Sequence, residues 1–128
     1  DSFKAINDAH GHLAGDHVLQ TVSRFFADHI RKSDMVARYG GEEFVFILSR
    51  TNLENGFKIV DRLREQLAGM TIDYHGTPIR LTMSVGVTVF SWETPPGKKE
   101  LIRQADSAMY KAKNAGRNRS MCYHPDQP

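Results

Sequence analysis

The sequence contains a single cysteine, Cys122, among its 128 residues. No disulfide can therefore form within the chain, which fits a reducing compartment such as the cytoplasm. No apolar run approaches the roughly 20 residues that a membrane-spanning helix needs, so we expect no membrane contact within this chain. The net charge of +2 is too small to indicate nucleic-acid binding. The apolar fraction of 40% and the charged fraction of 25% are typical of a soluble globular domain.

Helical periodicity marks three segments of the chain. Apolar residues recur at helical spacing over residues 13–30, 53–67 and 99–114, which predicts three amphipathic helices. The run Thr51-Asn52-Leu53-Glu54 has the form of a capping box at the start of the second helix. Gly69 and Gly116 follow the second and third segments, and we expect them to end those helices.

Short β-prone runs supply the strands. Residues 35–39 and 44–48 flank Gly40-Gly41, a pattern typical of a hairpin. Because the second arm is apolar on both faces, we expect it at the centre of a covered sheet. Residues 71–74, 79–90 and 120–123 are the other predicted strands. The predicted fold class is α/β of the α+β kind, with a five-stranded, mostly antiparallel central sheet and helices on both faces.

Two adjacent carboxylates, Glu42 and Glu43, lie in the predicted hairpin turn. One interpretation is a solvated acidic turn, since acidic residues are common in turns. The functional interpretation is that the two glycines let a ligand approach the backbone. The carboxylates would then supply hard oxygen ligands for Mg²⁺ or Mn²⁺ held jointly with phosphates, an arrangement suited to phosphoryl transfer.

A second polar cluster lies near the start of the chain. Lys4, on a predicted short loop, can pair with a phosphate as a point charge. Asn7 and Asp16 can together read a guanine edge, because the amide donates and accepts while the carboxylate accepts from the base N–H groups. The alternative is local capping, since Asn, Asp and Gly gather at helix ends.

Three segments carry a resemblance to a known family. They are Phe3-Lys4-x-Ile6-Asn7-Asp8-x-x-Gly11-His12-x-x-Gly15-Asp16, Arg38-Tyr39-Gly40-Gly41-Glu42-Glu43-Phe44 and Ala105-Asp106-x-Ala108-Met109-Tyr110-x-Ala112-Lys113-x-x-Gly116-Arg117-Asn118. In this order they resemble the GGDEF family of diguanylate cyclases. The resemblance implies a palm-like nucleotide cyclase fold and an enzyme that condenses two GTP into cyclic di-GMP, releasing two pyrophosphates. It also implies a second copy of the domain as partner, because two domains meet head to head.

The same resemblance implies a role for individual residues. Glu42 is expected to be the catalytic base and, together with Glu43, a metal ligand, and Lys4 is expected to stabilise transition-state charge. The expected substrate contacts are Phe3, Asn7, His12, Asp16, Lys113 and Arg117. For Lys113 and Arg117 the competing interpretation is that cations are favoured at a helix C-terminus.

The sequence departs from the family pattern in two places. The turn reads Gly-Gly-Glu-Glu-Phe in place of Gly-Gly-Asp-Glu-Phe, which is a common active variant. The family also has a strand that ends in Asp-x-Asp before Phe-Lys, and Asp1 aligns with the second of these aspartates. We therefore expect residues 1–128 to be one catalytic domain of a longer protein, whose first strand, further metal-ligand aspartate and upstream regulatory region precede Asp1.

Arg31 and Asp34 form an Arg-x-x-Asp pattern, with five residues between Asp34 and the glycine pair. In the family this pattern binds the product and inhibits the enzyme, and Arg62 matches a further arginine of that inhibitory site. Arginine suits such a site because it forms paired bonds to guanine or phosphate. The alternative is a solvated helix end.

Other functions stay open at this point. His10, His12 and His17 lack the spacing of a closed zinc site, and apart from His12 we interpret them as packing or loop residues. A catalytically silent GGDEF domain could serve as a sensor of GTP or cyclic di-GMP. A different palm-like enzyme, such as an adenylyl cyclase or a polymerase, is a further alternative, although Asn7 with Asp16 favours guanine. We expect a bacterial, cytoplasmic domain that upstream sequence could tether to a membrane protein.

Overall fold

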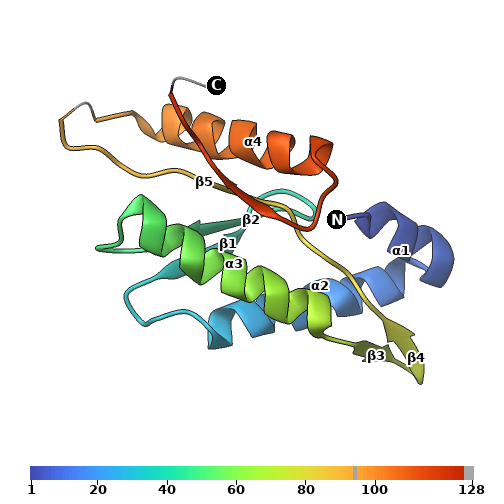
Figure 1. Cartoon of the computed structure of the whole chain (residues 1–128). Helices are drawn as coiled ribbons and strands as arrows, with labels where there is room; N and C mark the ends of the chain where they lie inside the picture. The colour runs from blue at the N-terminus through green and yellow to red at the C-terminus, as the bar shows by residue number, and fades with distance from the viewer. Residues whose placement is uncertain (94, 126–128) are drawn as a thin grey trace. The chain divides into compact units, whose positions relative to one another are not determined.

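A computed structural model describes residues 1–93 and 95–125 (Figure 1). The chain divides into two compact units. The N-terminal unit contains Ser2–Arg50 and Leu67–Leu81, and the C-terminal unit contains Asp1, Thr51–Gln66 and the described residues from Thr82 onward. Among the helices of the described residues, none combines the length and the apolar character that crossing a membrane requires.

Two helices form the core of the N-terminal unit. They are α1 (Phe3–His10) and α2 (His12–Asp28), which pack against each other on either side of Gly11 (Figure 1). The buried side of α2 includes Val18, Val22 and Phe26. Leu13, which the periodicity placed on this side, is 75% exposed. That prediction is wrong because Leu13 lies seven residues before Gln20, on the solvent side of the helix.

A β-hairpin packs on α2 in the same unit. Strands β1 (Met35–Arg38) and β2 (Phe44–Ile47) pair antiparallel, as predicted. The ring of Phe26 meets Phe44 and Phe46 edge-on, at centroid distances of 5.1 and 4.9 Å. Such edge-to-face pairs are favourable beyond the area they bury. The aromatic contact therefore fixes the base of the hairpin on the helix.

A second hairpin completes the N-terminal unit. Strands β3 (Ile72–Tyr74) and β4 (Thr77–Ile79) pair antiparallel around the turn His75-Gly76. His17 of α2 donates from Nε2 to the Asp73 carbonyl oxygen at 3.0 Å, and its ring lies 5.5 Å from that of Tyr74. The interpretation of His17 as a packing residue is confirmed by these contacts.

In the C-terminal unit, one helix packs on a parallel pair of strands. Helix α4 (Lys98–Asn114) contacts β5 (Val85–Val87) and β6 (Ser120–Cys122) (Figure 1). Gly86 makes this contact close, because a Cβ there would overlap the Ala105 carbonyl oxygen and lie 2.5 Å from the Met109 nitrogen. Helix α3 (Leu53–Gly69) begins in this unit, and its last turn belongs to the N-terminal unit.

The predicted helices are confirmed, with two local differences. The segment that holds Lys4 is helix α1 instead of a loop; two helical turns carry few apolar markers, here chiefly Phe3 and Ile6. At the start of α3 the side chain of Asn52 accepts the N–H of Asn55 at 2.8 Å. Asn52 is thus the capping residue, and the helix begins one residue later than a capping box on Thr51 requires.

The sheet differs most from its prediction. The described residues form three two-stranded ladders, β1–β2, β3–β4 and β5–β6, instead of one five-stranded sheet centred on the hairpin. The predicted strand 79–90 is divided, because Ile79 pairs with Ile72 whereas Val85 pairs with Ser120. Alternation of apolar residues indicates which side of a strand is buried, but it does not identify the strand's neighbours.

Polar contacts occupy the break between β4 and β5. The Thr82 carbonyl oxygen accepts from the Asp1 backbone nitrogen at 2.7 Å. The hydroxyl groups of Thr82 and Ser84 donate to the Asp1 carboxylate at 2.8 and 2.7 Å. This stretch of backbone and side chains therefore binds Asp1, all within the C-terminal unit.

Candidate functional site

The hairpin turn presents both glutamates to solvent. Gly40 has a φ of +84°, a conformation that glycine adopts without steric cost. The Tyr39 N–H donates to the Glu43 carbonyl oxygen at 2.7 Å, and Arg38 Nε donates to the Gly41 carbonyl oxygen at 2.9 Å. The backbone of the turn is thus held by its own hydrogen bonds. Glu42 and Glu43 are both exposed, and in residues 1–93 and 95–125 no hydrogen bond or ion pair holds either carboxylate.

Helices α1 and α2 bring Asn7 beside the turn that carries Asp16. Gly15, which precedes Asp16, packs directly against the Asn7 side chain and close to the Phe3 ring. Asn7 Oδ1 is buried and has no hydrogen-bond partner within the described structure. Lys4 lies in the first turn of α1 and is exposed, as are His12 and Asp16 at the start of α2. These five side chains therefore belong to one helix pair, with Phe3 and Asn7 partly buried.

The side chains of Arg31 and Asp34 bind each other. Arg31 donates from Nε and Nη2 to the two Asp34 carboxylate oxygens, each at 2.9 Å. The N–H groups of Arg31 and Ser49 also donate to this carboxylate, both at 3.1 Å. The Arg31 guanidinium, helped by these N–H groups, lowers the pKa of Asp34 below its ordinary value, although burial opposes the shift. The Asp34 side chain is 1% exposed, whereas that of Arg31 is 52% exposed.

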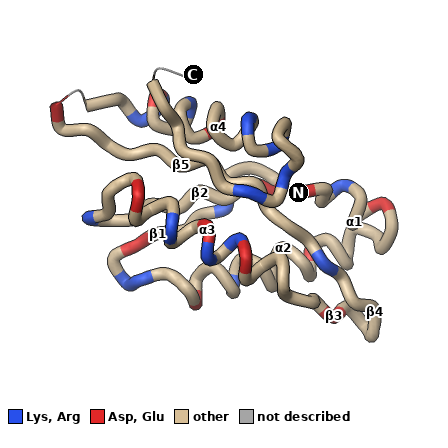
Figure 2. Tube along the Cα trace, in the orientation of Figure 1, with Lys and Arg blue, Asp and Glu red and all other residues tan. Residues whose placement is uncertain are grey.

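The predicted phosphate contacts of the C-terminal unit lie at the end of α4. Basic residues gather there and on the following turn (Figure 2). The N–H groups of Gly116 and Arg117 donate to the carbonyl oxygens of Lys113 and Ala112 at 3.3 and 3.0 Å, the two bonds of a Schellman motif. Gly116 thus ends the helix as predicted, with Lys113 half-buried and Arg117 exposed.

The turn after α4 is held by Arg64, a residue that the sequence patterns did not single out. Gly116, Arg117 and Asn118 have φ values of +119°, +63° and +47°. Arg64 Nη1 donates to the Asn118 side-chain oxygen at 2.9 Å, and the Asn118 N–H donates to the Asp1 carboxylate at 3.1 Å. Asn is one of the few residues that tolerate a left-handed conformation, which is the sequence signal that could have marked this turn.

Arg62, the further arginine of the predicted inhibitory site, lies on α3 and is exposed. It belongs to the C-terminal unit, whereas Arg31 and Asp34 belong to the N-terminal unit. The predicted catalytic residues Lys4 and Glu42 share the N-terminal unit, and Lys113 and Arg117 belong to the other.

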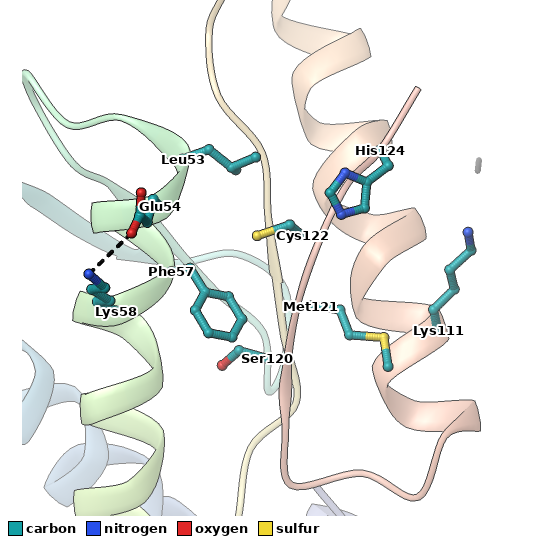
Figure 3. Close-up of a pocket in the computed structure, with 9 residues that line it drawn as sticks. All are labelled: Leu53, Glu54, Phe57, Lys58, Lys111, Ser120, Met121, Cys122 and His124. Carbon is teal, nitrogen blue, oxygen red and sulfur yellow. Dashed lines mark ion pairs between the residues drawn. The ribbon is translucent and has the colours of Figure 1, made fainter. Parts of the chain in front are cut away.

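An open pocket of about 740 Å³ lies in the C-terminal unit (Figure 3). It includes none of the predicted site residues. Its lining comes from the start of α3, from α4, from β6 and from the chain just after β6, with residues Leu53, Glu54, Phe57, Lys58, Lys111, Ser120, Met121, Cys122 and His124. Burial raises the pKa of the Cys122 thiol, so this cysteine has little thiolate character near neutral pH.

The donor chemistry of the hairpin turn suits a magnesium ion shared with a ligand. Within the part of the chain that the structure describes, no group of three or more His, Cys, Asp or Glu side chains can hold a metal ion by itself. Mg²⁺ is commonly bound by one or two carboxylates together with phosphate oxygens and water. Glu42 and Glu43, both exposed on the turn, fit that pattern.

Comparison with known proteins agrees with the motifs. The family model for "Diguanylate cyclase, GGDEF domain" matches residues 1–119. Over 119 residues the chain is 43% identical to diguanylate cyclase DgcP of Pseudomonas aeruginosa, a match that covers 93% of this chain and 17% of that protein. Diguanylate cyclase A of Treponema denticola is 39% identical over 119 residues, covering 93% of this chain and 32% of that protein. The chain thus spans about a third or less of these relatives' length.

Solved structures show the same fold. The GGDEF domain of DgcB from Caulobacter crescentus in complex with c-di-GMP has a TM-score of 0.87 at 27% identity, covering 95% of this chain and 72% of that one. The active GGEEF domain of a diguanylate cyclase from Vibrio cholerae has a TM-score of 0.82 at 32% identity, covering 97% and 78%. The chain belongs to the GGDEF domain family, and the predicted palm-like cyclase fold is confirmed.

Proposed function

We propose that this domain condenses two GTP molecules into cyclic di-GMP. The 3′-hydroxyl oxygen of each nucleotide forms a bond to the α-phosphorus of the other. The bond from that phosphorus to the bridging oxygen of the β-phosphate breaks, and pyrophosphate leaves. The observation that carries the proposal is the exposed Gly-Gly-Glu-Glu turn in the same unit as the Asn7–Asp16 helix pair. The Vibrio cholerae domain, described as active, has the same GGEEF turn.

Glu42 accepts the proton of the attacking 3′-hydroxyl group. Its exposed carboxylate on a turn fixed by backbone bonds can reach a ligand without a rearrangement of the fold. Glu42 and Glu43 would hold Mg²⁺ or Mn²⁺ jointly with the nucleotide, and the ion would supply positive charge for the phosphate oxygens. Lys4, exposed in the first turn of α1, places a positive charge where the transition state accumulates negative charge.

Guanine is read by the helix pair. Asn7 and Asp16 supply an amide and a carboxylate from adjacent turns of α1 and α2, and guanine offers complementary donors and acceptors. His12 and the Phe3 backbone complete the substrate contacts of this unit. Lys113 and Arg117, at the basic end of α4, bind the phosphates.

The domain works as a pair, since each active site contributes one nucleotide to a two-fold symmetric product. Product bound at Arg31, Asp34 and Arg62 inhibits the enzyme. The complex of the DgcB domain with c-di-GMP supports the presence of product-binding surfaces in such domains. The bacterial cytoplasm, where GTP is available, is the proposed location.

The direct test is incubation of the purified protein with GTP and Mg²⁺, followed by chromatography for cyclic di-GMP and pyrophosphate. We expect both products in a ratio of one to two, and a rate that rises more than linearly with protein concentration because two domains must meet. GTP binding without either product, from a protein shown to be folded and dimeric, would instead indicate a silent sensor domain. A cyclic mononucleotide as product would indicate a different cyclase.

A further inference from the structure

Gly15 is buried in the first turn of α2, and glycine in a helix has an energetic cost. In a helix, Gly is less favourable than Ala by about 1 kcal/mol. The backbone does not require glycine, since Gly15 has no positive φ. Space requires it instead: a Cβ on Gly15 would overlap Asn7 Oδ1, lie 2.9 Å from Asn7 Cγ and lie 3.1 Å from Phe3 Cζ.

The Asn7 amide oxygen occupies the space that Gly15 leaves against α2. This Oδ1 atom is buried and lacks a hydrogen-bond partner within the described residues, an arrangement that costs free energy and that packing against α2 must offset. Because the oxygen faces Gly15, the group left to meet a ligand is the Nδ2 donor. A donor matches O6 of guanine and mismatches the 6-amino group of adenine.

We infer that Gly15 is a positioning residue that sets base specificity through Asn7. It leaves the room that the amide needs to lie against α2, and so fixes which end of the amide meets the base. The inference rests on the proposed reading of guanine by Asn7. A methyl group at position 15 would force the Asn7 amide to rotate. Its Oδ1 and Nδ2 atoms could then both meet the base, so the amide would discriminate less between guanine and adenine.

The helix pair is expected to survive such a change. The obstructing atom belongs to the end of a short side chain, which can turn away, and Ala is the better helix former. Gly15 differs in this respect from Gly86, because a Cβ added at Gly86 would meet the backbone of α4. Gly15→Ala should therefore alter the ligand contacts of Asn7 more than the stability of the domain.

The test is a double-mutant cycle on nucleotide binding. Titration calorimetry with GTP and with ATP, in EDTA to prevent turnover, gives the GTP/ATP preference of the native protein, Gly15→Ala, Asn7→Ala and the double variant. We expect Gly15→Ala and Asn7→Ala each to lower the preference about tenfold, which lies within the range of discrimination that one good base contact provides. In the Asn7→Ala background, Gly15→Ala should add no further loss. Gly69→Ala, at a glycine with open space around it, is the matched control and should change nothing.

Each outcome of these titrations supports or overturns a specific role for Gly15 or Asn7. If Gly15→Ala lowers the GTP/ATP preference equally in the native and in the Asn7→Ala background, Gly15 has a general packing role and the inference is overturned. An unchanged preference in Gly15→Ala, when Asn7→Ala loses it, would also overturn the inference while leaving the proposed function standing. An unchanged preference in Asn7→Ala would remove the proposed guanine reader itself. If Gly15→Ala fails to fold, the double variant should fold, since the overlap is gone; failure of both would refute a role through Asn7.

Discussion

Arg64 holds Asn118 from 54 residues away, donating from Nη1 to its side-chain oxygen at 2.9 Å and to its backbone carbonyl oxygen at 3.3 Å. Asn118 is the last of three successive residues with positive φ. For residues other than glycine, a left-handed conformation costs about 1–2 kcal/mol each. Arg64, 14% exposed and also paired with Asp61 at 2.6 Å, therefore stabilises a turn that carries the proposed phosphate contact Arg117.

Replacement of Arg64 should destabilise the domain. Arg64→Ala removes charged hydrogen bonds from a mostly buried side chain, and we expect a loss of about 2–3 kcal/mol in the free energy of unfolding. Urea denaturation measures this change in the free energy of unfolding. The control on the same helix is Arg62→Ala, at an exposed position, which should stay within about 0.5 kcal/mol of the native protein. Equal effects of the two substitutions would contradict the structural role of Arg64.

The Arg31–Asp34 pair should make stability depend on acidic pH. The pKa of Asp34 in the folded protein lies below its ordinary value of 3.8, so the unfolded chain takes up the proton first as the pH falls. The contribution of Asp34 is thus complete above the unfolded pKa and is lost as the pH falls through the folded pKa. Asp34→Asn should destabilise the protein by about 2–4 kcal/mol near pH 7 and flatten its loss of stability below about pH 5.

The measurement is urea denaturation between pH 7 and pH 3. Asp28→Asn, at an exposed carboxylate near the end of α2, is the matched control and should leave the pH profile of the native protein unchanged. If Asp34→Asn also keeps the native profile, other carboxylates are responsible for the acid sensitivity.

How far the sequence predicts this structure depends on the range of the interaction. Amphipathic periodicity located α2, α3 and α4, because helices are set by neighbours three and four residues apart. It missed the two turns of α1. It also joined β4 and β5 into one strand, since the bond between Asp1 and Thr82 spans 81 residues and leaves no local pattern. The motifs likewise named Asn7 and Asp16, whereas the fit of Asn7 against Gly15 needed the packed helices.

The close approach of β5 to α4 leaves no room for a side chain at Gly86. A Cβ at this position would overlap the Ala105 carbonyl oxygen, and backbone in a packed helix cannot turn away as a side chain can. We expect Gly86→Ala to cost about 3 kcal/mol or more, as overpacking of a tight site does. The unfolding midpoint in urea measures this. Gly15→Ala is the comparison, and a larger loss there would contradict the difference between a side-chain obstacle and a backbone obstacle.

Product inhibition is better tested at Arg62 than at Arg31. Removal of Arg31 leaves the buried carboxylate of Asp34 without its main partner, so loss of inhibition could follow from loss of structure. Arg62 is exposed, and Arg62→Ala should raise the cyclic di-GMP concentration for half-inhibition about tenfold while the initial rate is kept. Arg24→Ala, at an exposed arginine of α2, should leave inhibition intact. Unchanged inhibition in Arg62→Ala would remove this residue from the proposed site.

Glu42 offers the sharpest test of the proposed chemistry, because its side chain is exposed and its replacement should not disturb the fold. Glu42→Gln keeps the size of the side chain and removes the negative charge, and we expect turnover to fall at least about 100-fold, as on removal of a general base. Glu42→Asp keeps a carboxylate and recreates the Gly-Gly-Asp-Glu-Phe turn for which the family is named, so it should retain activity within about tenfold. Both variants should unfold at the urea concentration of the native protein. Mg²⁺-dependent GTP binding, measured by calorimetry, should weaken in Glu42→Gln and persist in Glu42→Asp. Comparable turnover in the Gln and Asp variants would show that the carboxylate of Glu42 neither takes the proton nor holds the metal.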